Sequence, residues 1–185
     1  MNWIYYPKTS KIPNFLKQTV SVFENHYDLF NSDKQLYRID HGEQEDQFDS
    51  NHVLKILEPG LENLGFKVEK GKKKEQKIRV TVKYGNAGKE ELNFEADAYH
   101  ETEKVVVEVE AGRAHANNQF LKDIFQASMM IDTDYLVLAV KNTYRNNKKT
   151  KSFTKDFEKI NEFIETIFLT GKIQLNLKGI LLIGY

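Results

Sequence analysis

The sequence has no cysteine, and this absence removes several kinds of protein from consideration. Among 185 residues there is no thiol to form a disulfide or to ligate a metal. The five histidines do not fall at zinc-ligand spacing either. The composition is compatible with a reducing intracellular setting, and neither cross-links nor a zinc centre is expected.

Long apolar runs are also missing. The longest are far shorter than the roughly 20 residues needed to cross a bilayer. Residues Met1 to Lys8 lack the basic start and apolar core of a signal peptide. We therefore expect a soluble, cytoplasmic protein.

An excess of charge of either sign is the third absence. The chain carries 27 basic and 27 acidic side chains, so its net charge does not indicate the class of partner. Hydrophobic residues make up 40% and aromatic residues 12%, which argues against wholesale disorder. The simplest organisation is a single domain, residues 1–185, with a substantial core.

Hydrophobic periodicity predicts four helices and several strands. Helices are expected at 13–30, 50–64, 116–131 and across Phe157 to Phe168, with a loop around 42–46. Pro59 predicts a kink or break between Lys55 and Glu58. Strands are expected at 66–69, 78–84, 92–99, 105–110, 135–140 and 180–183. This order predicts an α/β domain with a mixed sheet between helices.

Acidic side chains alternate along two adjacent predicted strands. Glu95 and Asp97 are two residues apart on the first, and Glu108 and Glu110 are two apart on the second. Each pair shares one face of its strand, so a hairpin would gather three or four carboxylates. Like charges repel and raise one another's pKa, and a divalent cation relieves the conflict. Oxygen ligands suit Mg²⁺, with Mn²⁺ as a second possibility.

The order of these elements resembles the PD-(D/E)XK nuclease superfamily, particularly type II restriction endonucleases. The likeness rests on Asp97, ten intervening residues, Glu108-Val109-Glu110, and then a helix and a buried strand. It covers about residues 50–141, the expected catalytic core. The resemblance implies a restriction-endonuclease-like three-layer fold, in which helices flank a central mixed sheet.

The sequence departs from the superfamily pattern at two positions. No proline precedes Asp97, and Glu110 stands where lysine is usual, although some restriction enzymes carry Glu-x-Glu there. The resemblance implies that Asp97 and Glu108 hold the metal. Glu110 would bind a second ion or act as the general base.

An auxiliary acid is expected from the helix at 50–64. Glu58 and Glu62 are the candidates, and Glu58 is slightly preferred as a metal ligand because it lies nearer the predicted kink. A surface role accounts for either residue equally well. Glu95 is expected to be solvated, one pleat too far along its strand to reach the metal.

Two basic segments, 67–79 and 141–151, would contact the phosphate backbone of nucleic acid. Solvated loops explain such segments equally well in isolation. The helix at 116–131 is expected to bury Phe120, Leu121, Ile124, Phe125 and Ser128, which leaves Lys122 beside its apolar face. The candidate nucleic-acid-binding residues are Lys72, Lys73, Lys74, Arg113, Lys122, Arg145, Lys148 and Lys149.

These features predict a Mg²⁺-dependent deoxyribonuclease of restriction-enzyme or defence type. It would hydrolyse duplex DNA with metal-activated water and act as a homodimer. The chief alternative is a non-catalytic nucleic-acid-binding module that retains the nuclease fold. An unrelated α/β interaction protein, with its acids apart on the surface, is the third reading.

Overall fold

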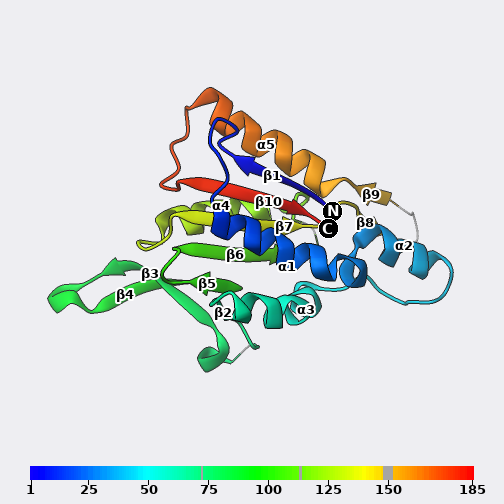
Figure 1. The fold of residues 1–185 in the computed structure, drawn as a ribbon, viewed down its shortest axis with the longest axis horizontal. Coiled ribbons are helices and arrows are strands. Elements are labelled where there is room, and N and C mark those ends of the chain that lie inside the picture. Colours follow the sequence, from blue (N-terminus) through cyan, green and yellow to red (C-terminus); the bar gives the residue numbers. More distant parts are fainter. Residues whose placement is uncertain (72, 113, 148–151) are drawn as a thin grey trace.

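A computed structural model covers residues 1–185 and describes all of them except 72, 113 and 148–151 (Figure 1). It is a mixed α/β fold built on a six-stranded sheet with strand order β1-β10-β7-β6-β5-β2. The strands are β1 (Asn2–Tyr6), β2 (Lys67–Val68), β3 (Ile78–Tyr84), β4 (Glu90–Ala96), β5 (Ala98–His100), β6 (Val105–Glu110), β7 (Tyr135–Val140), β8 (Tyr144–Asn147), β9 (Ser152–Thr154) and β10 (Gly179–Gly184). The helices are α1 (Asn14–Phe30), α2 (Ser32–Asp40), α3 (Ser50–Asn63), α4 (Gln119–Met129) and α5 (Asp156–Thr170), with short 3-10 turns η1 (Lys74–Gln76) and η2 (Asn86–Gly88).

The centre of the sheet is parallel and its flanks are antiparallel. β6, β7 and β10 run parallel, whereas β1 is antiparallel to β10 and β5 is antiparallel to β6. The strands β7 and β10 are buried along almost their whole length. This explains their continuous apolar sequences, which are typical of strands covered on both faces.

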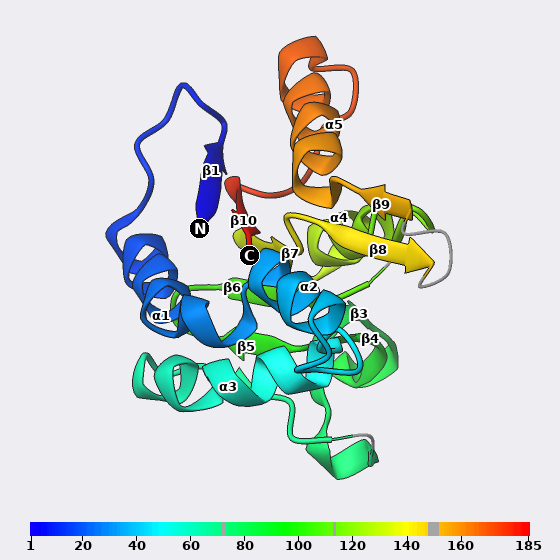
Figure 2. The ribbon, with the colours of Figure 1, turned by 90° about the vertical axis from the view of Figure 1, so that its right-hand side faces the viewer.

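Helices cover both faces of the sheet, as Figure 2 shows. Side chains of α1 and α3 share one hydrophobic cluster with Val107 and Val109 of β6. Side chains of α4 and α5 share the other cluster with Val106. Because neighbouring residues on a strand point to opposite faces, Glu108 and Glu110 lie on the face covered by α4.

Helix α3 continues through Pro59, so the predicted break is wrong. Asp49 caps its N-terminus by accepting a hydrogen bond from the backbone N–H of His52. Leu57 and Leu61, on either side of the proline, are both fully buried. Proline removes only one backbone hydrogen-bond donor. The apolar stripe of α3 that contains Leu57 and Leu61 packs against the sheet, and this packing keeps the helix continuous.

The predicted strand 92–99 is divided at Asp97. Before this bend, β4 pairs with β3 in a separate two-stranded ribbon; after it, β5 pairs with β6 in the main sheet. Figure 1 shows the ribbon extending away from the body of the fold. The acidic hairpin is therefore paired only over its short β5–β6 part.

The strands β1, β8 and β9 and the helix α2 are not in the predicted set of elements. The four predicted helices are confirmed within a few residues as α1, α3, α4 and α5. The loop around 42–46 is also observed. Within the described part of the chain, no helix combines the length and apolar character needed to cross a membrane.

Candidate functional site

The bend between β4 and β5 places Asp97 beside β6. Ala98 lies opposite Val107, so the next position along the pair sets Asp97 next to Glu108. The backbone N–H of Val109 donates a hydrogen bond to Oδ2 of Asp97 at 2.7 Å. Asp97 and Glu108 thus come from neighbouring chain segments on one side of the sheet, as the sequence predicts.

A further carboxylate, Asp123 of α4, completes the cluster and was not predicted. Its side chain is 1% exposed and faces the sheet between Phe120 and Ala127. The predicted apolar face of this helix is partly wrong, because Phe125 is 44% exposed. A spacing of i, i+3, i+4 and i+7 from Phe120 contains Asp123 and Ile124, and this signal in the sequence could have identified the buried acid.

We define the acid cluster as Asp97, Glu108, Glu110 and Asp123. All four carboxyl groups have a raised pKa, and burial is the largest cause in each case. Repulsion from Asp97 and then from Asp123 adds to the effect of burial on Glu108. The pKa of Asp97 rises to about 6 and that of Glu110 to about 8. Without a cation, the cluster therefore retains protons near neutral pH.

Glu110 and Asp123 interact directly within the cluster. After burial, the charge of Asp123 and a hydrogen bond to its side chain are the main causes of the raised Glu110 pKa. A protonated Glu110 would donate to Asp123, because two ionised carboxylates have no proton to share. Oδ1 of Asp123 also lies 3.2 Å from the ammonium nitrogen of Lys122. Apart from these two contacts, the carboxylate of Asp123 has no partner among the described residues, so it can still accept a cation or a donor.

Lys122 partly neutralises the acid cluster. Its Nζ lies 3.2 Å from Oδ1 of Asp123, and its charge lowers the pKa of both Glu108 and Glu110 against the larger effect of burial. More than half of its side chain is exposed, so the ammonium group also faces solvent. Lys122 is thus placed where a phosphate approaching the acids would meet it.

A second acid, Glu69, lies near Asp97 and was also absent from the prediction. It is among the charges that raise the pKa of Asp97, after burial. Both oxygens of Glu69 accept hydrogen bonds from Nζ of Lys77 at 2.8 Å. This ion pair therefore borders the cluster, and Lys77 slightly opposes the upward shift of the Asp97 pKa.

Glu58, the predicted auxiliary metal ligand, does not belong to the acid cluster. It belongs to α3, which covers the face of the sheet opposite α4. Nζ of Lys70 lies 3.2 Å from Glu58 and 2.8 Å from Glu62. In this conformation Glu58 takes part in an ion pair with Lys70. Glu95 is exposed and lies 3.6 Å from Nζ of Lys77, in agreement with its predicted solvation.

Arg145, a predicted nucleic-acid contact, is held within the protein. Its guanidinium group is buried, and Nη2 donates to both oxygens of Asp40 at 2.7 Å. The group also lies over the ring of Phe153, 5.1 Å from the ring centroid. These contacts occupy the side chain within the protein, so it serves as a cross-brace between α2 and β8.

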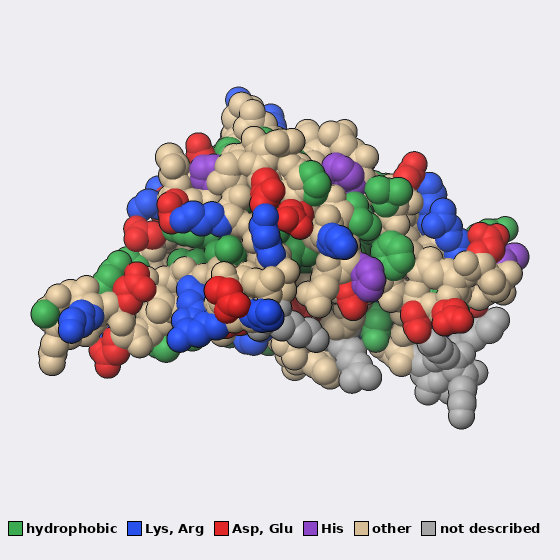
Figure 3. Space-filling view, turned by 90° about the horizontal axis from the view of Figure 1, so that it is seen from below, with side chains coloured by type: hydrophobic (Ala, Val, Ile, Leu, Met, Phe, Trp, Pro, Cys, Tyr) green, Lys and Arg blue, Asp and Glu red, His purple; other side chains and the backbone are tan. Residues whose placement is uncertain are grey.

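The other predicted basic contacts are only partly observable. Lys73 and Lys74 are exposed around η1, whereas Lys72, Arg113, Lys148 and Lys149 lie outside the described residues. On the face seen in Figure 3, acidic and basic side chains are interspersed. Lys70 and Lys77 each form an ion pair with an acidic side chain.

A preformed metal cage is absent from the described residues, where no three His, Asp or Glu side chains are arranged to hold an ion as they stand. The chemistry of the acid cluster nevertheless suits Mg²⁺ or Mn²⁺, since its donors are all carboxylate oxygens. Holding an ion would require side-chain rotation and loss of the retained protons.

Comparison with known proteins adds no relative. No protein-family model matches the chain, and neither do any curated protein sequences or solved structures.

Proposed function

We propose that this protein is a Mg²⁺-dependent nuclease that hydrolyses phosphodiester bonds in duplex DNA. The observation that carries the proposal is the acid cluster: four carboxyl groups contributed by the bend before β5, by β6 and by α4, each with a raised pKa. A purely structural sheet gains nothing from such a cluster, because every additional buried charge is destabilising. A divalent cation would convert this repulsion into binding energy.

The path of the chain around the cluster supports a restriction-endonuclease-like fold. The helix α3 comes first, then the bend before β5 and the strand β6 carry the acids, and α4 leads into the buried strand β7 parallel to β6. This is the order on which the resemblance to PD-(D/E)XK nucleases rests. The order of these elements along the chain and the parallel direction of β6 and β7 thus support the proposed fold.

In the proposed reaction, a bound Mg²⁺ would acidify the attacking water and offset charge on the phosphate. Asp97 would be held in place by Val109 and would share the ion with Glu108. Glu110 and Asp123 would bind a second ion or, once Glu110 is ionised, take the proton of the attacking water. Lys122 would contact the phosphate from the exposed side of the cluster.

A non-catalytic nucleic-acid-binding module is the second candidate. The observation in its favour is that no three acids among the described residues form a ready metal cage. The position of Glu110, where the superfamily usually carries lysine, points the same way. In that case the acids would persist as a protonated cluster and the chain would bind nucleic acid without cutting it.

A plasmid-nicking assay separates the two candidates. Purified protein is incubated with supercoiled DNA in Mg²⁺, in Mn²⁺ and in EDTA. We expect nicked or linear product with either ion and none in EDTA. Binding of DNA without cleavage in either ion would favour the binding module and refute the nuclease.

Cleavage of both strands further implies a homodimer, because a two-fold axis places one centre on each strand. Light scattering of the protein with duplex DNA in Ca²⁺ would measure this directly. A single copy per duplex under those conditions would restrict the proposal to a nicking enzyme.

A further inference from the structure

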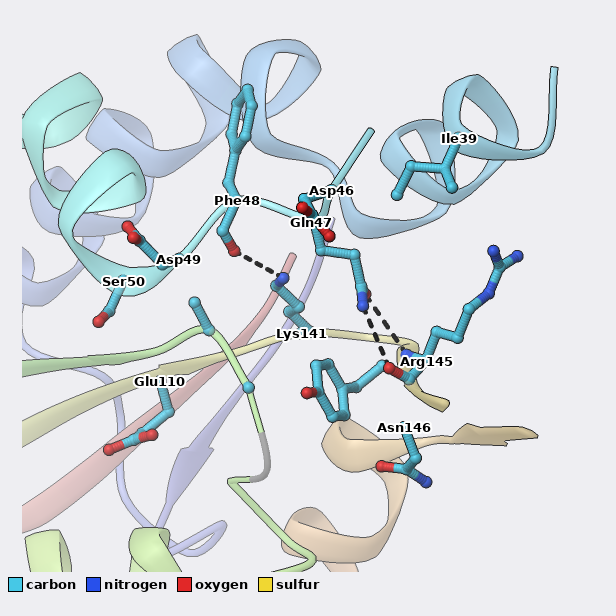
Figure 4. A pocket seen from close by; sticks show the side chains of 13 residues that line it. Ile39, Asp46, Gln47, Phe48, Asp49, Ser50, Glu110, Lys141, Arg145 and Asn146 are labelled. Atoms are coloured by element: carbon cyan, nitrogen blue, oxygen red, sulfur yellow. Dashed lines mark hydrogen bonds between the residues drawn. The ribbon is translucent and has the colours of Figure 1, made fainter. Parts of the chain in front are cut away.

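A hollow of about 460 Å³ lies at the carboxyl ends of β6 and β7, next to the acid cluster. Its volume lies within the range of small-molecule binding sites. Glu110 borders both the hollow and the cluster, and the loop before α3 forms the opposite wall. Figure 4 shows the side chains that surround this space.

Two buried cations, Lys141 and Arg145, line the hollow, and Arg145 is already paired with Asp40. Lys141, the residue after β7, is 1% exposed, and its Nζ donates to the backbone oxygen of Phe48 at 2.8 Å (Figure 4). An ammonium group has three N–H donors, and this is the one hydrogen bond that the Lys141 ammonium makes with the described residues. A buried, incompletely paired ammonium is costly unless an anion or further acceptors complete its shell.

The charged state of Lys141 is compatible with an anionic ligand. Burial lowers its pKa to about 8, with Asp49 and Asp156 acting in the opposite direction. The side chain therefore remains mostly protonated at neutral pH. A phosphate in the hollow would stabilise this charge further.

The acids that border the hollow have other partners or orientations. Asp49 accepts hydrogen bonds from the backbone and the ring of His52 as the cap of α3. Glu110 points away from Lys141 (Figure 4) and interacts with Asp123 of the acid cluster. Asp46 also borders the hollow. An anion would thus meet some residual repulsion, and we expect its affinity to be modest.

An aromatic side chain stands beside the cation. Nζ of Lys141 lies 5.8 Å from the centroid of the Tyr144 ring. A Cβ on Gly112 would come within 3.2 Å of that ring, so glycine allows the backbone after β6 to lie close against it. Aromatic rings next to basic groups suit nucleotides, which present both a phosphate and flat surfaces.

We propose that this hollow is a subsite for the phosphate of the nucleotide next to the scissile bond, with Lys141 as its cationic anchor. The identity of the ligand rests on the proposed nuclease function, because Glu110 joins the hollow to the acid cluster. The substrate strand would then run from the acids into the hollow, with its phosphate on Lys141 and its sugar or base beside Tyr144.

The test is binding of a deoxynucleoside 5′-monophosphate to the full chain in EDTA, measured by calorimetry. The matching nucleoside without phosphate is the ligand control. We expect the monophosphate to bind at least tenfold more tightly than the nucleoside. Lys141→Met should remove this preference. Lys104 is the matched control, because it is a partly exposed lysine just before the first residue of β6, at the end of the strand away from the hollow. Lys104→Met should keep the preference.

A second measurement covers the case in which Lys141→Met does not fold. In the wild-type chain, the monophosphate should shift the NMR signal of the carbon next to Nζ of Lys141. No shift on saturation, or equal affinity for nucleoside and monophosphate, would overturn the subsite. Equal binding by a folded Lys141→Met variant would do the same.

These outcomes are separable from those of the nuclease assay. Binding is measured without a metal and should survive Asp97→Asn. Phosphate binding that depends on Lys141 in a protein that never cleaves DNA would retain the subsite and reject the nuclease. DNA cleavage by a protein in which Lys141 has no role in phosphate binding would retain the nuclease and reject the subsite.

Discussion

The backbone N–H of Val109 donates a hydrogen bond to the carboxylate of Asp97, so the residue between the two glutamates of β6 holds the acid of the neighbouring bend. This contact fixes Asp97 beside Glu108 and lowers its pKa. Burial acts more strongly in the opposite direction, and the pKa of Asp97 still rises to about 6. The hydrogen bond thus fixes the position of Asp97, whereas burial disfavours its ionised form.

Replacing Asp97 by asparagine should abolish metal-dependent cleavage and leave the fold intact. The amide oxygen can still accept the hydrogen bond from Val109, but the ligand charge is lost. Without metal, we expect the free energy of unfolding at neutral pH to rise by about 1–2 kcal/mol, because a charged group with a raised pKa is removed. Glu95→Gln, an exposed neighbour on β4, should change both quantities little. Wild-type cleavage by Asp97→Asn would refute the role of Asp97.

Asp123→Asn tests the acid that α4 contributes. If Asp123 helps to hold the ion, the affinity for Mn²⁺ should fall at least about tenfold, as measured by calorimetry. Asp132→Asn, an exposed acid after α4, is the matched control. Unchanged Mn²⁺ affinity in Asp123→Asn would show that Asp123 does not help to hold the ion and has only a structural role.

Glu110→Lys restores the residue that is usual in the superfamily, and we expect activity to collapse. If Glu110 binds a second ion or accepts a proton, lysine removes that function and adds positive charge among the acids. Partial rescue by Mn²⁺ is expected, since it tolerates irregular oxygen coordination better than Mg²⁺. Glu95→Lys makes the same charge reversal on an exposed site and should remain active. Full activity of Glu110→Lys in Mg²⁺ would show that the residue is only a placeholder.

The stability of the metal-free protein should fall as the pH rises from about 4 to about 8. Asp97 and Glu110 bind protons more tightly in the folded state, with pKa values of about 6 and about 8. Their stabilising contribution is complete below the unfolded-state values and is lost as the pH rises through the folded-state values. Thermal melts in EDTA across this range measure the slope, and saturating Mg²⁺ should flatten it. A melting temperature that rises throughout the range in EDTA would contradict the assigned shifts.

Arg145→Met tests the brace between α2 and β8. The variant removes the two charge-assisted hydrogen bonds to Asp40, and we expect a loss of about 1–3 kcal/mol in the free energy of unfolding. Lys34→Met, which removes an exposed ion pair with Asp28, should cost much less. Chemical denaturation measures both variants. Weaker DNA binding by Arg145→Met without any loss of stability would instead support the original nucleic-acid assignment.

Local patterns in the sequence predict most of the fold. The four predicted helices are observed because each has an apolar stripe that packs against the sheet. The strand β1 is not predicted because its partner β10 lies at the other end of the chain, and no local pattern reports that pairing. The helix α2 is short and begins at Ser32, directly after α1 ends, so its few buried residues give a weak periodic signal.

The candidate site is predictable where it depends on strand alternation. Period two places Glu108 and Glu110 on one face, and the register of β5 and β6 sets Asp97 beside them. Asp123 is not among the predicted site residues, because a charged residue is seldom fully buried within an apolar stripe. The burial of Arg145 was not predictable, because the sequence does not reveal the distant Asp40 that pairs with its charge.

The separation of the β3–β4 ribbon from the main sheet has a consequence for amide hydrogen exchange. Two strands alone are marginally stable, and this ribbon is fastened to the body partly by a hydrogen bond from Ile131 to Thr81. Its amides should therefore exchange through a local opening that leaves β6, β7 and β10 protected. Because the ribbon joins the sheet at Asp97, ion binding at that residue should slow exchange along β4 while changing β10 little.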